Sequence, residues 1–376
     1  MAGIYIHIPF CKQKCSYCDF HFSTTFEAYR SKMIDSLCHE IEFVTDDPDF
    51  DEITTLQTIY FGGGTPSLLH EDELEQLIST IHSNYTVASD AEITLEANPD
   101  DISIDQINNW KALGINRMSI GIQSFRESDL QWMNRAHTVE EGLNCIRIAQ
   151  DSGISNLSVD LIYGLPDLSL EEWKEHVKRV IDMGVQHISA YCLTVEEKTS
   201  LHHLVNQQKL RPANEDEQHD QFLALLEIME QNGYEQYEIS NFARPGFRAV
   251  HNSNYWKRIP YIGIGPSAHS YAKKKRRWNI ANNRSYMKAI NAKEKWYETE
   301  VLDKRAIWNE LLLTGLRTSE GVERNELTSW DSFTTTDEQQ IAQFEELGWL
   351  KTSNDRLVLT KKGRLMADHI ASSLFH

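Results

Sequence analysis

The sequence has no long apolar run and no N-terminal targeting segment. No uninterrupted apolar stretch approaches the roughly 20 residues that a membrane-spanning helix needs, so any membrane contact should be peripheral. The first ten residues, MAGIYIHIPF, contain no basic segment, no long apolar segment and no small-residue cleavage site. They predict a cytoplasmic protein.

Cations are also scarce. The formal net charge is −19, and the only dense basic run is Lys273 to Arg277. Phosphate binding needs clustered cations, whereas one short basic stretch in an acidic chain is typical of a solvated loop. We therefore expect no nucleic-acid partner.

The six cysteines are too few for a disulfide scaffold in a chain of 376 residues. Three of them fall within eight residues, which in a reducing compartment suggests a metal site. The other three, Cys38, Cys145 and Cys192, are scattered and are expected to be buried thiols.

Short β-branched runs alternate with helical patterns up to about residue 195, which predicts repeated βα units around a parallel sheet. The predicted strands are Ile4–Ile8, Thr58–Phe61, Glu92–Leu95, Arg117–Ile122, Leu157–Ile162 and His187–Leu193. The predicted helices between them are Phe26–Val44, Glu71–Ser83, Ile104–Leu113, Val139–Ser152 and Leu170–Met183. Six units are fewer than the eight of a closed barrel, so we expect an α/β fold with an open, partial (β/α)6 TIM-like barrel.

The pattern changes after residue 195. A helix is predicted over Glu215–Gln231, and the aromatic and Gly-rich region 233–271 is expected to extend the barrel irregularly. Helical segments at Ile307–Leu316 and Glu338–Leu347, a hairpin around Asn354-Asp355 and a last helix follow. This change of pattern along the chain predicts two domains. The first is a partial barrel with its extension (1–280), and the second is a small, mainly helical, winged-helix-like C-terminal domain (281–376).

The strongest motif is Cys11-Lys-Gln-Lys-Cys15-Ser-Tyr-Cys18, directly after the first predicted strand. Three thiolates at this spacing can hold three irons of a cubane [4Fe–4S] cluster and leave the fourth iron open. A structural zinc site with His7 or His21 as fourth ligand is the alternative. The position at the C-terminal end of a barrel strand, where active sites are built, favours the cluster.

Further polar and Gly-rich positions follow the other strands. Phe61-Gly62-Gly63-Gly64-Thr65-Pro66 follows the second strand, and its glycines allow either close approach of a ligand or simply a tight turn. Glu96, Gln123 and Asp160 lie at or near the ends of the next three strands. They are placed to project toward the barrel mouth or to form strand-end ion pairs.

Taken with these motifs, the segment from Tyr5 to Phe20 resembles the radical S-adenosylmethionine (SAM) superfamily, and within it the coproporphyrinogen oxidase and HemW branch. The resemblance covers nearly the whole chain. It implies that SAM binds the open iron and is cleaved reductively to a 5′-deoxyadenosyl radical, which requires an electron donor. The SAM-binding positions that it implies are Tyr5, Gly63, Gly64, Thr65, Glu96, Gln123, Arg135 and Asp160. The number of bound SAM molecules stays open.

Two departures separate this chain from the oxidase pattern, which carries a further cysteine at the position of Phe20 and a longer segment before the first strand. In addition, His251-Asn-Ser-Asn-Tyr255-Trp256 matches the HNxxYW element associated with heme in the HemW branch. Imidazole is a good ligand for heme iron, and the aromatic residues can pack on a porphyrin face. A core histidine with aromatic packing is the alternative. His269, in a Gly-rich turn, is a weaker candidate to approach a cofactor.

The resemblance therefore implies a heme chaperone with a [4Fe–4S] cluster, SAM and heme, in porphyrin metabolism. Its partners would be acceptor hemoproteins, in solution or at a membrane, and a homodimer stays open. The alternatives are an oxygen-independent coproporphyrinogen III oxidase, which forms protoporphyrinogen IX, and a zinc-stabilised barrel enzyme. Oxidase activity is not expected, because Phe20 and the His251 element both depart from the oxidase.

Overall fold

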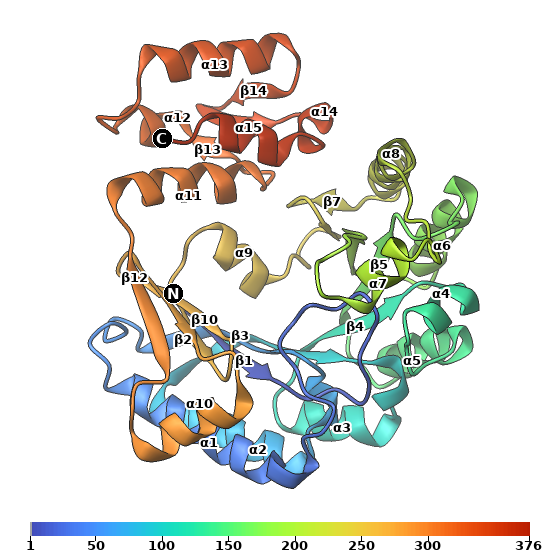
Figure 1. The fold of residues 1–376 in the computed structure, drawn as a ribbon, viewed down its shortest axis with the longest axis vertical. Helices are drawn as coiled ribbons and strands as arrows, with labels where there is room; N and C mark the ends of the chain where they lie inside the picture. The colour runs from blue at the N-terminus through green and yellow to red at the C-terminus, as the bar shows by residue number, and fades with distance from the viewer. Residues whose placement is uncertain (1) are drawn as a thin grey trace.

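Six parallel strands form the centre of a curved sheet in the computed structural model, which describes residues 2–376 (Figure 1). They lie side by side in chain order, β1 to β6, each in parallel register with the next. Their bounds are β1 (Gly3–Ile8), β2 (Thr55–Gly63), β3 (Thr86–Ala97), β4 (Arg117–Gln123), β5 (Asn156–Tyr163) and β6 (His187–Cys192). The predicted six-stranded partial barrel is confirmed.

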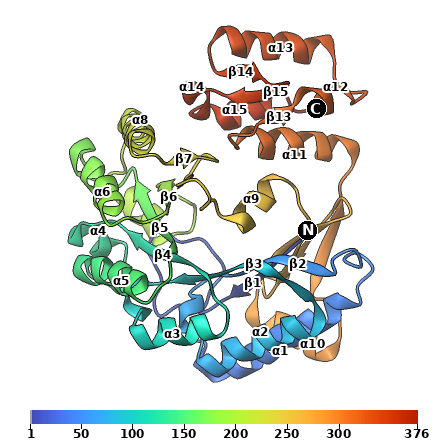
Figure 2. The same ribbon diagram turned by 180° about the vertical axis from the view of Figure 1, so that it is seen from behind.

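Helices between the strands cover the outer face of this sheet (Figure 2). They are α1 (Arg30–Thr45), α2 (Glu71–Asn84), α3 (Ile104–Ala112), α4 (Glu127–Trp132), α5 (Val139–Asp151) and α6 (Leu170–Asp182), with α8 (Glu215–Gln231) beside α6. The short helix α7 (Ser200–Asn206) lies between β6 and α8 in the chain. Thr138 and Ser169 cap α5 and α6, each with a glutamate three residues on that bonds back. These capping boxes satisfy backbone N–H groups that the first turn leaves free.

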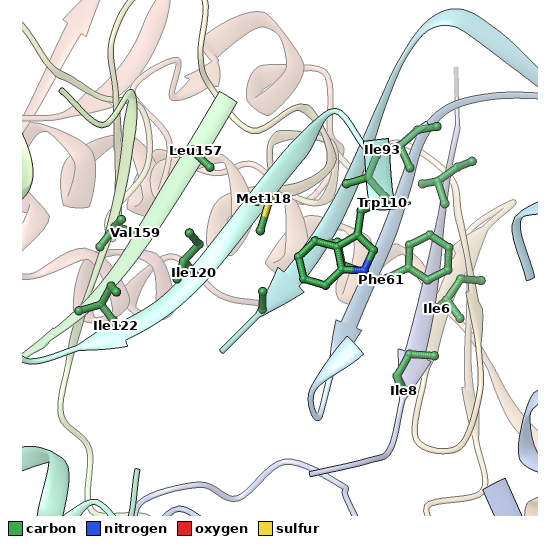
Figure 3. Close-up of a cluster of buried hydrophobic side chains, with 14 of the residues drawn as sticks. Ile6, Ile8, Phe61, Ile93, Trp110, Met118, Ile120, Ile122, Leu157 and Val159 are labelled. Atoms are coloured by element: carbon green, nitrogen blue, oxygen red, sulfur yellow. The ribbon is translucent and has the colours of Figure 1, made fainter. Parts of the chain in front are cut away.

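The core lies between the sheet and these helices. In β1 the residues Ile4, Ile6 and Ile8 are fully buried, and Figure 3 shows the last two in one apolar layer with Phe61 and Trp110. Burial of each isoleucine side chain stabilises the folded state by roughly 1.5–3 kcal/mol. Because side chains alternate along a strand, the residues between these isoleucines point to the inside of the barrel.

Both edges of the sheet are extended by shorter strands. The extension next to β1 is β9 (Tyr261–Ile264), β10 (His269–Ala272), β11 (Lys275–Asn279) and β12 (Tyr297–Val301), and next to β6 it is β8 (Asn241–Ala243) and β7 (Glu235–Gln236). β9 runs parallel to β1, whereas β10, β11 and β12 are antiparallel to their neighbours. Region 233–271, expected to extend the barrel irregularly, supplies β7, β8, β9 and most of β10 to these extensions, with turns and loops between them. It also holds the short helix α9 (Val250–Trp256).

A smaller domain with its own core sits above α9 in Figure 1. It consists of α11 (Lys304–Leu316), α12 (Arg324–Thr328), α13 (Thr335–Glu346), α14 (Lys361–Arg364) and α15 (Ala367–Ser373) with a sheet of β13 (Val322–Glu323), β15 (Arg356–Leu359) and β14 (Leu350–Ser353). The hairpin at Asn354-Asp355 is confirmed, and both residues have positive φ, as a type I′ turn requires. Among the described helices, none is both long and apolar enough to cross a membrane.

The segment 283–301, which the sequence placed in the C-terminal domain, lies with the large sheet. Helix α10 (Asn283–Ala292) packs on α1, and β12 pairs with β11. The buried residues of α10 belong to the barrel core, whereas those of the C-terminal core begin at Trp308. We therefore propose a domain boundary near Leu302 in place of residue 280.

A buried carboxylate fixes this extension to the barrel. Glu40 of α1 is 1% exposed, and burial raises its pKa to about 7 against the opposing effect of its hydrogen bonds. Four donors reach it: Gly265 N, Asn279 Nδ2 and Trp296 Nε1, each at 2.7 Å, and the Tyr286 hydroxyl. The Glu40 side chain thus joins α1 to β11, to α10 and to the residues next to β9 and β12.

We expect Glu40→Ala to lower the free energy of unfolding by roughly 3–5 kcal/mol, because it leaves several buried donors without an acceptor. Chemical denaturation of the purified protein measures this loss. Glu42→Ala, an exposed position on the same helix, is the control and should change stability little. Equal stability of the two variants would contradict the role of Glu40.

Candidate functional site

The cysteine loop leaves the C-terminal end of β1 and crosses the barrel mouth, as the dark blue trace in Figure 1 shows. Backbone hydrogen bonds hold it on three sides. Cys11 N donates to Ser23 O at 3.1 Å, Ser16 N to Met133 O at 2.9 Å, and Leu201 N to Ser16 O at 2.7 Å. The loop is therefore fixed by segments that follow β1, β4 and β6.

All three cysteines of the motif line one cavity of about 460 Å3. Burial raises the pKa of Cys11 to about 12 and that of Cys18 to about 11. Two donors point at the sulfurs: Thr65 Oγ1 is 3.5 Å from Cys11 Sγ, and Arg135 Nη1 is 3.5 Å from Cys15 Sγ. Thiols this buried need a cationic ligand to stay ionised, and a metal centre supplies one.

The geometry disfavours the zinc alternative. His7 Nε2 donates to His21 O at 2.8 Å, and His21 Nε2 lies 2.7 Å from Asn283 Oδ1. Among the described residues, no three His, Cys, Asp or Glu side chains surround one point closely enough to hold a single ion. A cubane cluster needs no such point, because its cysteine ligands bind separate irons.

The glycine run at the end of β2 packs against β1 and lines the same cavity. A Cβ on Gly63, whose φ is +104°, would lie 2.4 Å from the His7 ring. On Gly64 it would lie 2.6 Å from the Phe10 carbonyl oxygen. Glycine is thus required by strand packing, and both residues still present backbone to the cavity.

Two partly buried carboxylates face the cavity from β3 and β5, the strands on either side of β4. Glu96 accepts hydrogen bonds from the Tyr60 hydroxyl at 2.8 Å and from Gly63 N at 3.1 Å, and Asp160 accepts one from Ser119 Oγ at 3.2 Å. Burial raises the pKa of Glu96 to about 7 and also raises that of Asp160, and the negative charge of Asp160 adds to the rise at Glu96. Such a pair favours a cationic or hydroxyl-bearing ligand.

Unusual backbone positions two further cavity residues. Gln123, at a β-bulge that ends β4, has φ +74°, and Asn134 has φ +58° just before Arg135. Arg135 Nη2 donates to Asn98 Oδ1 at 2.8 Å and to Gly121 O at 2.7 Å, while its buried Nε has no partner among the described residues. Positive φ in a non-glycine residue is often held by a functional site.

A second cavity of about 870 Å3 adjoins the first. The two share Asp19, Phe20, Gly63 and Glu96 in their walls. Phe20 is 69% exposed, so its ring stands at the junction. Tyr5, expected beside SAM, lines only this second cavity, because β1 directs it to the inner side of the barrel next to β9.

His251 lies in neither cavity. It is 2% exposed on α9, with Nδ1 2.7 Å from Thr58 Oγ1 and Nε2 2.8 Å from the Tyr255 hydroxyl. Its ring stacks on Tyr60 at 4.9 Å, and burial lowers its pKa to about 3. Tyr255 and Trp256 of the same helix do line the second cavity. The tyrosine hydroxyl thus occupies the nitrogen that a metal ligand would use.

The structure brings ten of the twelve predicted site residues to the first cavity; Tyr5 and His251 are the exceptions. It adds Asn98, Ser119 and Tyr191 to the walls. A sequence signal existed for Ser119, since it precedes Gln123 by four residues on the same face of a strand. None existed for Tyr191, which is 43% exposed at the end of β6.

We expect Arg135→Met to loosen the cysteine loop, because Arg135 joins it to the ends of β3 and β4. In the cluster-free protein Cys15 should then react faster with an alkylating reagent, measured by mass spectrometry against buried Cys145 as internal reference. Arg147→Gln, at an exposed position of α5, is the control. Unchanged reactivity of Cys15 would rule out this role for Arg135.

Comparison with known proteins agrees with this geometry. The family model of the radical SAM superfamily matches residues 5–180, and that of the HemN C-terminal domain matches residues 302–366. In structure, the chain is similar to coproporphyrinogen III oxidase (HemN) from Escherichia coli, with a TM-score of 0.84 over 100% of this chain and 90% of that one. At 21% identity this likeness shows the fold alone.

In sequence, the chain is similar to proteins named heme chaperone HemW. It is 33% identical to that of Lactococcus lactis over 97% of this chain and 95% of the relative. It is 32% identical to that of Bacillus subtilis over 98% of each. With this similarity over nearly the full length of both relatives, and with its three cysteines at the mouth of a partial barrel, the chain belongs to the HemW family of radical SAM proteins.

Proposed function

We propose that this protein is a heme chaperone, which binds heme and delivers it to acceptor hemoproteins. The observation that carries the proposal is the full-length similarity to proteins of that name. An aromatic cavity beside the cysteine cavity, large enough for a cofactor, is consistent with it. We expect the protein to work in the cytoplasm, with an electron donor and with acceptors in solution or at a membrane.

Membership in the radical SAM superfamily implies a [4Fe–4S] cluster and SAM. We assign the cluster to Cys11, Cys15 and Cys18, whose thiols share one cavity with two hydrogen-bond donors. Together the cluster and SAM supply one-electron radical chemistry. The protein's own contribution is to hold the thiolates beside a fixed guanidinium and to keep the loop rigid.

The remaining polar groups of the first cavity suit the parts of SAM. Glu96 and Asp160 offer carboxylates that accept from an ammonium or from ribose hydroxyls. Arg135 has an unpaired buried Nε that fits a carboxylate. Backbone of Gly63 and Gly64, the Thr65 hydroxyl and the Gln123 amide line the rest. Tyr5 would contact SAM only from the second cavity.

For the heme iron we propose His251 as axial ligand, through Nε2. Coordination requires the hydrogen bond between Nε2 and the Tyr255 hydroxyl to break and the Tyr255 ring to move, because that ring lies in the cavity wall. The low pKa of His251 keeps the imidazole neutral, as ligation needs.

Replacing Cys11 and Cys15 together by alanine should abolish the cluster, because one thiolate cannot hold a cubane. Iron and sulfide contents after anaerobic reconstitution measure this loss. Cys38→Ala, which removes a buried thiol of α1 outside the cavity, should retain both contents. The assignment is wrong if the double variant binds as much iron and sulfide as the unaltered protein.

The function itself is tested in one anaerobic preparation with two assays. Incubation with SAM, a reductant and coproporphyrinogen III should yield no protoporphyrinogen IX, and heme titration should reach stoichiometric binding. Turnover of coproporphyrinogen would make the protein an oxidase instead. Phe20, in place of the oxidase cysteine, is the feature that favours the first outcome.

The same titration locates the iron ligand. His251→Ala should change the absorption spectrum of bound heme and weaken binding. His269→Ala is the matched comparison, since His269 lines the second cavity and its imidazole has no hydrogen-bond partner among the described residues. A spectral change with the second variant alone would move the ligand to His269.

A further inference from the structure

The second cavity lies where the sheet extension meets the C-terminal domain. One side comes from β1, β9, β10, β11 and α9, and the other from α11 through Glu310 and Thr314. In Figures 1 and 2 α9 lies between the large sheet and α11. Its volume of about 870 Å3 falls within the roughly 300–1,000 Å3 typical of cofactor pockets.

Seven of the 21 residues in the wall carry large aromatic rings. The rings that line it are Tyr5, Phe20, Tyr255, Trp256, Tyr261, Tyr271 and Trp278. Tyr255 and Tyr261 form an edge-to-face pair at 4.4 Å, and Tyr271 follows at 6.5 Å. Flat apolar walls of this kind suit a planar macrocycle better than a flexible polar ligand.

Two arginines face the same space, and both are paired with acids of the C-terminal domain. Arg258 Nη2 is 3.0 Å from Glu326 Oε1, and Arg276 Nη2 is 2.8 Å from Glu310 Oε1. Burial raises the pKa of Tyr271 and the charges of both arginines oppose this rise, so both arginines stand close to one ring of the wall. Glu310 Oε2 is buried and has no hydrogen-bond partner among the described residues.

We propose that a porphyrin dicarboxylate binds in this cavity with its two propionates on Arg258 and Arg276, in place of Glu326 and Glu310. The inference rests on the proposed function, in which that porphyrin is heme. Guanidinium binds any carboxylate in the same forked geometry, so a propionate can replace a glutamate without leaving the arginine unpaired.

The charges of the cavity require this exchange. Asp19, Glu96, Glu300 and Glu310 all line it, so a dianion meets net repulsion while the arginines remain neutralised by the domain's own acids. Binding is favourable only where the two propionates take over the guanidinium groups. Porphyrin binding then removes two ion pairs that join the C-terminal domain to the sheet.

Several other contacts between the domains involve residues outside the cavity wall. Glu320 pairs with Lys257 at 3.1 Å and with Arg248 at 3.5 Å, and Ser319 N donates to Tyr237 O at 2.9 Å. These stay intact when the propionates bind. The C-terminal domain is thus loosened on the cavity side and held on the other, which opens the cavity toward a heme acceptor.

The test compares heme with its dimethyl ester, in which both propionates are uncharged. The unaltered protein should bind heme roughly tenfold or more tightly than the ester, because two charge-assisted contacts are lost in the ester. Arg258→Gln with Arg276→Gln should bind the two ligands equally. Arg324→Gln, which breaks an Arg–Glu pair inside the C-terminal domain, should keep the preference.

A second variant works in the opposite direction. Glu310→Gln with Glu326→Gln frees the arginines, so its affinity for heme should rise several-fold while that for the ester stays unchanged. A merely structural ion pair would not give this gain. Hydrogen exchange at α11 and α12 should also increase when heme, but not the ester, is added to the unaltered protein.

The outcomes separate the inference from the proposed function. If heme binds neither to the unaltered protein nor to any variant, the proposed chaperone function is wrong. If heme binds and the preference over the ester survives in the arginine double variant, the chaperone function stands and this site is wrong. If the glutamine variant shows no gain for heme, the exchange of carboxylates is wrong.

Discussion

The contact between β1 and the end of β2 is the constraint on which both cavities depend. Gly63 and Gly64 approach β1 so closely that a Cβ on either would meet the His7 ring or the Phe10 carbonyl. This contact fixes the start of the cysteine loop, and the alternation of β1 directs Tyr5 and His7 inward. One short strand therefore orients the metal ligands on one side and the aromatic cavity on the other.

Burial of charged groups determines what the first cavity can hold. Burial raises the pKa values of Glu96, Asp160, Cys11 and Cys18, and the buried Nε of Arg135 has no hydrogen-bond partner among the described residues. Each of these groups is costly to bury alone and becomes satisfied when an opposite charge enters. A cationic metal centre with a zwitterionic ligand neutralises all of them at once, which is why the cavity suits that combination better than a neutral substrate.

The six barrel strands could be read from the sequence because they are long, β-branched and separated by well-capped helices. β10, β11 and β12 could not, because they are only four or five residues long, and β11 and β12 are also rich in charge. The cysteine motif by itself indicated a metal site at the end of β1. A core histidine was one of the two alternatives for His251, but its hydrogen bond to Thr58 could not be predicted, since Thr58 is 193 residues away in the chain. Tyr255, one helical turn after His251, was the only local signal.

A heme carrier must bind a flat, apolar dianion and also give it up. Aromatic walls alone would retain it, because their contribution to binding does not change between loading and release. Glu310 and Glu326 compete with the propionates for the same arginines and so favour release of the porphyrin. They lower the affinity by a fixed amount, and they return to Arg258 and Arg276 as the propionates leave. Release is then driven by re-formation of the ion pairs that close the C-terminal domain on the sheet, so transfer to an acceptor needs no separate source of energy at this site.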